Sequence, residues 1–170
     1  MAVIKQKEQR VGIFIDTQNL YHSAKNIYNG KVNFGNVLED TLAERILVRA
    51  IAYAVTTEAG DESEFLDALE RIGIETKTKD LQVFSGGAKK GDWDVGLAVD
   101  CIKFAPKLDV VVIVSGDGDF VPLVDHLKSQ GCQVEIASFG KSTSARLIEA
   151  TDHFIDLDEN PRRYLLRMRR

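Results

Sequence analysis

The chain has 170 residues, 44% of them hydrophobic and 28% charged, which fits one globular domain with a substantial core and excludes two ordinary domains. A formal net charge of −4 argues against a generally basic nucleic-acid-binding surface, because phosphate contacts need Lys and Arg. The charge is uneven, however, since acids gather in a few motifs and arginines crowd the C-terminus: Arg162, Arg163, Arg167, Arg169 and Arg170. Such a mixed surface suits a metal-dependent enzyme that acts on a polyanion.

The two cysteines, Cys101 and Cys132, each lie in an apolar stretch without a CxxC motif or a neighbouring His. We therefore expect them to be buried core residues in a reducing compartment. The polar start MAVIKQKEQR has no signal-peptide stretch, and no run approaches the ~20 apolar residues of a membrane span. These features predict a cytoplasmic protein that does not bind a membrane.

Apolar or alternating segments typical of strands recur along the chain. They are residues 11–15, 46–55, 74–84 (as one strand or two pieces), 109–114, 133–138 and 153–156. Apolar spacing and stop signals predict helices from just after Asp16 to Asn29, and then at 34–44, 61–72 (capped by Asp61), 93–104, 120–130 and 142–150. A flexible basic loop is expected at 85–91 and a short helix in the last ten residues. This alternation indicates βαβ units, so the predicted fold class is α/β with a parallel sheet.

Acids stand where two of the predicted strands end, and ligands of an open parallel sheet bind beyond those carboxyl ends. Asp16 follows the first strand, with Asn19 close behind. The strand at 109–114 runs into SGDGD, which carries Ser115, Asp117 and Asp119. Carboxylates that face one another at buried strand ends are unfavourable unless protons or a cation compensate. A hard cation such as Mg²⁺ accepts these oxygen ligands.

Each of these acids also has a purely structural interpretation. Asp16 and Asp119 could each cap the helix that follows, and SGDGD could be only a turn. One cap needs one side chain, whereas SGDGD offers two carboxylates and a hydroxyl. We therefore favour a metal site.

The segment GDWDVGLAVD supplies two more candidate acids. Asp94 lies at or near a helix N-terminus, where free N–H groups favour a carboxylate. Asp100 is turned from it by roughly 120° and lies about 9 Å further along the axis. The two point into one cleft only if the helix crosses beside it. An acid among the apolar neighbours of Asp100 indicates a functional role.

Several other sites are excluded by their missing motifs. The chain has no GxxxxGK[S/T] phosphate loop, no GxGxxG fingerprint and no GxSxG elbow. The histidines show no zinc-ligand spacing. A phosphoaspartyl hydrolase would need an acid two residues after Asp16, where this chain has Gln18.

Three segments together resemble the NYN domain, in its LabA-like branch, which belongs with the PIN-like nucleases. They are FIDTQNLY (residues 14–21), KGDWDVGLAVD (90–100) and SGDGDFVPLVDHLKSQG (115–131). The resemblance implies a single-domain, three-layer PIN-like fold with a central, mostly parallel sheet flanked by helices. It implies this domain over residues 11–158, with an N-terminal extension at 1–10 and a basic C-terminal tail at 159–170.

The resemblance also implies a ribonuclease that depends on Mg²⁺ or Mn²⁺. The acids carried over to this chain are Asp16, Asp94, Asp100, Asp117 and Asp119. All but Asp100 would hold the metal directly or through water, and Asp100 would hold it or orient a water. Asn19 and Ser115 would support these acids. Water activated by the metal would hydrolyse a phosphodiester bond of RNA, with Lys89 and Lys90 contacting the RNA backbone.

Two other functions stay open beside this endoribonuclease. One is a regulatory module that binds nucleic acid or protein and turns over slowly or not at all. The other is a metal-dependent phosphatase, which would need a closed pocket in place of an open cleft. A homodimer is compatible with so small an enzyme.

Overall fold

The computed structural model describes residues 3–57, 62–83, 85, 89–90 and 92–167. Its centre is a six-stranded sheet in which every pairing is parallel, with the order β3-β2-β1-β6-β7-β8. The strands are β1 (Arg10–Asp16), β2 (Ile46–Thr56), β3 (Glu75–Asp80), β6 (Val110–Val114), β7 (Gln133–Ser138) and β8 (His153–Asp156). The expected α/β fold with a parallel sheet is confirmed.

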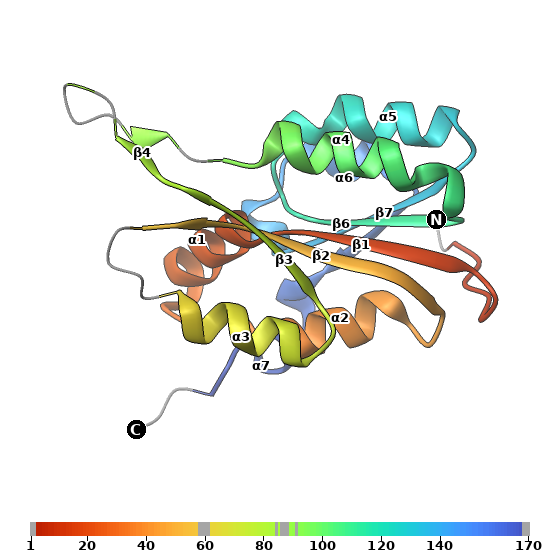
Figure 1. Cartoon of the computed structure of the whole chain (residues 1–170). Helices are drawn as coiled ribbons and strands as arrows, with labels where there is room; N and C mark the ends of the chain where they lie inside the picture. Colours follow the sequence, from red (N-terminus) through yellow and green to blue (C-terminus); the bar gives the residue numbers. More distant parts are fainter. Residues whose placement is uncertain (1–2, 58–61, 84, 86–88, 91, 168–170) are drawn as a thin grey trace.

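Helices cover both faces of this sheet and complete three layers (Figure 1). One face carries α1 (Thr17–Tyr28), α2 (Phe34–Leu42), α3 (Ser63–Arg71) and α7 (Pro161–Tyr164). The other carries α4 (Asp94–Phe104), α5 (Val121–Ser129) and α6 (Ala145–Ala150). No helix in the described part of the chain is both long and apolar enough to span a bilayer.

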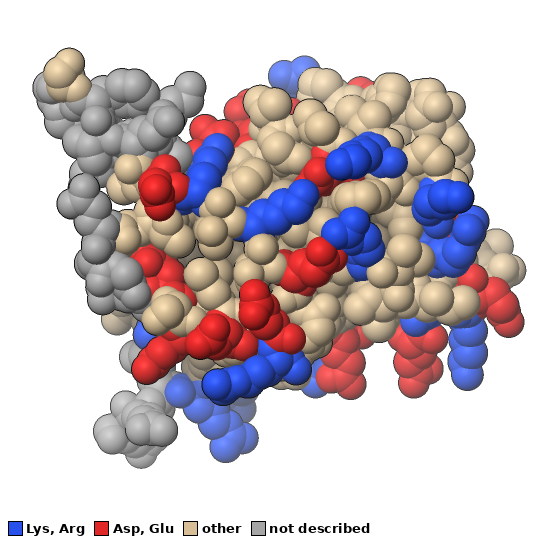
Figure 2. Space-filling model, viewed as in Figure 1, with Lys and Arg blue, Asp and Glu red and all other residues tan. Residues whose placement is uncertain are grey.

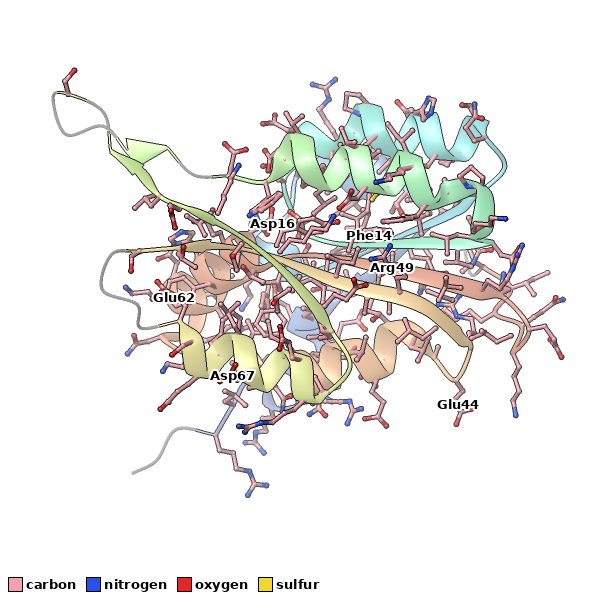
Figure 3. All side chains as sticks on the ribbon, viewed as in Figure 1. Phe14, Asp16, Glu44, Arg49, Glu62 and Asp67 are labelled. Atoms are coloured by element: carbon pink, nitrogen blue, oxygen red, sulfur yellow. The ribbon has the colours of Figure 1, made fainter. Side chains whose placement is uncertain are left out.

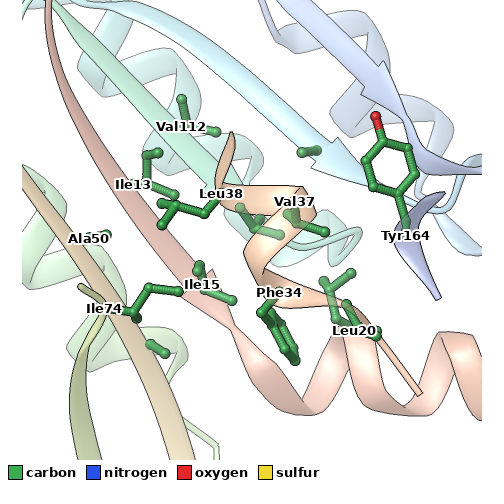
Figure 4. Packing of buried hydrophobic residues seen from close by; sticks show 14 of the residues in the cluster. Ile13, Ile15, Leu20, Phe34, Val37, Leu38, Ala50, Ile74, Val112 and Tyr164 are labelled. Carbon is green, nitrogen blue, oxygen red and sulfur yellow. The ribbon is translucent and has the colours of Figure 1, made fainter. Parts of the chain in front are cut away.

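The core consists of two apolar clusters, one on each side of the sheet. Successive side chains of a strand point to opposite faces, so Ile13 and Ile15 of β1 join the cluster under α1 and α2, whereas Phe14 joins the cluster under α4 and α5. Figure 4 shows part of the first cluster, with Ile13 and Val112 beside Leu38 of α2. Because β1 and β6 are buried on both faces, they read as continuous apolar runs in the sequence.

The strand order reverses direction between β1 and β6, which are neighbours at the centre of the sheet. Their register places Ile15 opposite Val114. The next residues, Asp16 and Ser115, therefore emerge side by side at the carboxyl edge. In parallel α/β folds this switch point is where a crevice for ligands opens.

A few local features differ from the sequence expectations. The segment 74–84 forms two strands, β3 and β4 (Gln82–Val83), which is one of its two expected forms. The departure is β5 (Lys89–Lys90), which lies inside the expected loop and pairs with β4. Local alternation could not reveal β5, because two residues are too short for a periodic signal. Asp61, the expected cap of α3, lies outside the described residues. Cys101 and Cys132 are buried and free, as predicted.

A buried ion pair joins the two halves of the sheet on the α1/α2 side. Arg45, just before β2, donates to both oxygens of Glu135 in β7 at 2.9 and 3.0 Å. It also donates to the carbonyls of Thr41 and Leu42 at the end of α2. Both side chains are at most 1% exposed. Because the guanidinium of Arg45 bonds both to Glu135 and to the end of α2, this pair fixes the turn between α2 and β2.

Candidate metal centre

Asp16 is the last residue of β1, and each of its carboxylate oxygens accepts a different hydrogen bond. One oxygen, Oδ1, accepts the backbone N–H of Asn19 at 3.2 Å and caps α1. The other, Oδ2, accepts the hydroxyl of Ser115 at 3.1 Å. The capping interpretation is therefore correct, and it leaves the second oxygen facing the loop after β6. Burial, followed by the charges of Asp117 and Asp92, raises the pKa of Asp16 against the lowering effect of these hydrogen bonds.

The loop after β6 is held by short polar contacts. Asn19 accepts the backbone N–H of Gly116 through Oδ1 at 2.9 Å, which ties α1 to the loop. The buried Ser115 hydroxyl accepts the N–H of Asp117 at 3.2 Å. Asp117 in turn accepts the N–H of Asp119 at 2.9 Å and caps a short 3₁₀ turn over Gly118–Phe120. The cap of this turn is therefore Asp117, and Asp119 stays exposed toward solvent.

Asp94 comes to the same place from the opposite side, as the first residue of α4. One oxygen each of Asp94, Asp117 and Asp119 lies within 4.8 Å of the others. Figure 3 shows Asp16 near the start of α4, on the same edge of the sheet. We call Asp94, Asp117 and Asp119 the carboxylate triad.

Negative charge is concentrated around Asp94. Burial, and then the negative charges of Asp117, Asp16 and Asp92, raise the pKa of Asp94 to about 7. A carboxyl that titrates near neutral pH marks a place where a cation would relieve repulsion. All donors are carboxylate oxygens, and hard divalent ions such as Mg²⁺ and Mn²⁺ prefer such donors. The residues present thus fit a divalent metal ion.

An open cleft of about 1150 Å³ adjoins the triad between α4 and α5. Asp92, Asp94 and Asp119 line it at one end, together with Lys79 and Asp80. Sequence reasoning left Asp92 unassigned, although the repeated acid in GDWD was a visible signal. The structure places Asp92 at the cleft, where its charge adds to the pKa rise of Asp94.

Asp100 lies apart from the triad, further along α4. It is buried, and its Oδ2 accepts the hydroxyl of Tyr53 and the ammonium of Lys77, each at 2.7 Å. Burial would raise the pKa of Asp100, but these two partners outweigh it and lower the pKa. The side chain is therefore an ionised acceptor that joins α4 to β2 and β3 through Oδ2.

The structure thus gathers Asp94, Asp117 and Asp119 and places Asp16, Asn19 and Ser115 directly behind them. It does not bring Asp100 into this group. The side chains of Lys89 and Lys90, expected to contact substrate, lie outside the described part of the structure.

The sequence profile of the NYN domain matches residues 10–158. This chain belongs to the NYN domain family. This match confirms the expected resemblance. NYN domains belong to the PIN-like nuclease superfamily.

Relatives and a solved structure agree with this assignment. The NYN chain is 28% identical over 162 residues to the "Low amplitude and bright protein LabA" of Synechococcus elongatus, covering 90% of this chain and 86% of LabA. It is 25% identical to an uncharacterized protein of Methanocaldococcus jannaschii, of whose length it spans 58%. The crystal structure of a Vibrio parahaemolyticus protein of unknown function superposes with a TM-score of 0.85 at 31% identity, covering 96% of this chain and all of that one.

Proposed function

We propose that this NYN protein is a metal-dependent ribonuclease. The observation that carries the proposal is the carboxylate triad at the switch point of the sheet, where the pKa of Asp94 is raised to about 7. Asp94, Asp117 and Asp119 would hold Mg²⁺ or Mn²⁺, with Asp16 as a fourth carboxylate behind them. Such an ion would supply acidification of water and neutralisation of phosphate charge for phosphodiester hydrolysis.

The remaining residues would keep the triad in place. Ser115 and Asn19 fix the loop that carries Asp117 by the hydrogen bonds described above. We assign Asp100 a positioning role, since its bonds to Tyr53 and Lys77 hold α4, and with it Asp94, against the sheet. Supporting hydrogen bonds of this kind set the orientation of metal ligands.

RNA as substrate is supported by the family and by the shape of the site. The cleft beside the triad is open to solvent along α4 and α5, which suits a polymer better than a small enclosed ligand. We further propose residues 11–158 as the catalytic domain. The segment after it continues onto α2, where Arg163 donates to both oxygens of Asp40 at 2.6 Å.

The test is cleavage of labelled single-stranded RNA with Mn²⁺, with Mg²⁺ and with EDTA. Asp117→Asn removes one triad charge, and Asp125→Asn on the exposed face of α5 is the matched control. We expect cleavage that needs metal, that falls at least a hundredfold in Asp117→Asn and that persists in Asp125→Asn.

Other outcomes would replace this function with a different one. Metal and RNA binding without cleavage of several RNAs would leave a binding module. Hydrolysis of a small phosphomonoester such as p-nitrophenyl phosphate, with RNA left intact, would indicate a phosphatase. Cleavage that survives Asp117→Asn would remove the triad from the reaction.

A further inference from the structure

We propose that α4 is the platform on which single-stranded RNA lies, with phosphates along one flank and bases along the other. The inference deepens the proposed ribonuclease and rests on it for the identity of the polymer. The phosphate flank is a row of cations: Lys79, Lys77, Arg49 and Lys103, which we call the cation row.

Each cation of the row contacts a side chain of α4 or of Trp93 just before it, and these contacts follow one another along the helix. Lys79 Nζ lies 4.9 Å from the centre of the Trp93 ring, immediately before α4 begins. Lys77 is bound to Asp100 at 2.7 Å. Arg49 and Lys103 lie over the Phe104 ring, at 4.2 and 5.7 Å from its centre.

Because an α-helix rises about 1.5 Å per residue, anchors from Trp93 to Phe104 spread the row over roughly 16 Å. Figure 2 shows Lys and Arg side chains crossing this face of the molecule in a row over α4 and β3. In Figure 3, Arg49 lies on the α4 side of the sheet. The cations therefore follow the helix and do not cluster at one point.

The row begins at the metal centre. Lys79 lines the same cleft as Asp92, Asp94 and Asp119. A polyanion lying along α4 would therefore bring one of its phosphates beside the triad while neighbouring phosphates met the cations. Without such cations, the acids at the triad would repel an approaching phosphate.

Part of this positive charge is left for a ligand. Lys77 and Arg49 offset Asp100 and Glu75, and both keep about a third of their side-chain surface exposed, 38% and 34%. Lys79 and Lys103 form no ion pair with any described carboxylate, and their contacts are with aromatic rings. These contacts hold the ammonium groups in place before a ligand arrives, which lowers the entropy cost of binding.

The second flank of α4 is apolar although it faces solvent. Val95, Val99 and Ile102 are 76%, 54% and 45% exposed, and their spacing aligns them in one stripe along the cleft. Exposed apolar stripes of this kind commonly mark a binding surface. Bases are accessible to such a stripe only in a single strand, since a duplex covers them. Cations on one flank and an apolar stripe on the other thus favour single-stranded nucleic acid over a duplex.

The test measures binding separately from cleavage, by fluorescence anisotropy of a labelled 12-nucleotide RNA in EDTA at several salt concentrations. Lys79→Ala/Lys103→Ala removes the two cations of the row that pair with no described carboxylate, and both sites are exposed. Lys25→Ala/Lys31→Ala, on the opposite side of the sheet, removes the same charge and is the matched control.

We expect the row variant to bind roughly tenfold more weakly, with the salt slope reduced by about 1.4 for two lost phosphate contacts. The control should stay within about twofold of the wild type. Val95→Ser/Val99→Ser should weaken the binding of single-stranded RNA and leave the affinity for a 12-base-pair duplex unchanged.

Failure of this inference and failure of the ribonuclease give different results. Equal binding by the row and control variants, while the wild type cleaves RNA, would overturn the cation row alone. Selective loss of binding in the row variant, with no cleavage by any form, would leave the row and reject the nuclease. Duplex RNA or polyglutamate bound as tightly as single-stranded RNA would overturn the assigned ligand.

Discussion

Replacing Asp94 with Asn should stabilise the metal-free protein, although it removes a residue of the proposed site. The raised pKa means that the folded state binds the Asp94 proton more tightly than the unfolded state does. The wild type therefore loses stability as pH rises from about 4 to about 7. Asp94→Asn mimics the neutral acid and should escape this loss.

The magnitude follows from the pKa. A rise from 3.8 to about 7 corresponds to about 4 kcal/mol for a fully buried group. Asp94 is partly exposed, so screening by solvent reduces this to about 1–2 kcal/mol. Loss of the favourable carboxylate at the α4 N-terminus opposes it by about 0.3–1 kcal/mol. The net gain is about 1 kcal/mol at pH 8, or a rise in Tm of about 2–4 °C for a chain of this size.

The assay is thermal unfolding in EDTA from pH 4 to pH 8, with Asp125→Asn as the control for net charge. At pH 4 Asp94→Asn and wild type should unfold together, and at pH 8 the variant should unfold at the higher temperature. Mn²⁺ should then raise the Tm of the wild type more than that of the variant. An ion stabilises the folded protein in proportion to how tightly it binds, and the variant lacks one of the proposed ligands. An unchanged or lower Tm for Asp94→Asn at pH 8 would refute the crowding of charge at the triad.

Three further substitutions test other parts of the structure. Arg45→Met leaves Glu135 buried without its partner and should cost about 3–5 kcal/mol in urea unfolding, with recovery when Glu135→Leu is added; a loss below 1 kcal/mol would contradict the buried pair. Gly96→Ala places a methyl group 2.5 Å from the Trp93 ring, so we expect shifted tryptophan emission and about 1–3 kcal/mol lower stability; an unchanged emission spectrum would contradict this packing. Ser115→Ala removes the hydroxyl that binds the carboxylate at the end of β1 and should weaken Mn²⁺ affinity about tenfold by calorimetry; unaltered affinity would exclude this supporting role.

Much of the fold could be predicted because its central strands, β1 and β6, are buried on both faces. β6 differs from the prediction by one residue, since a continuous β-branched run bounded by turns has few other solutions. β7 and β8 lie at the predicted residues. β5 and its pairing with β4 were missed because this pairing depends on contacts between segments and not on periodicity.

The candidate site was partly predictable for a related reason. Asp16 is the last residue of β1 and Asp117 lies three residues after the end of β6, so topology alone brings these two strand ends together. Asp94 depends on how α4 crosses the sheet, which no local pattern specifies. Asp100 shares that helix, and only the structure shows that Tyr53 and Lys77 already bind one of its carboxylate oxygens. The cation row was invisible in the sequence because its members come from β2, β3 and α4.

The central position of β1 has a consequence for biosynthesis. Val11 pairs with Val110, so one edge of β1 has no partner until the ribosome has released most of the chain. During that interval an apolar strand edge is open to wrong pairing, and contacts this distant in sequence form slowly. Asp16 also meets the triad only after β6 has docked. A nascent chain that still lacks β6 therefore cannot assemble the acidic centre.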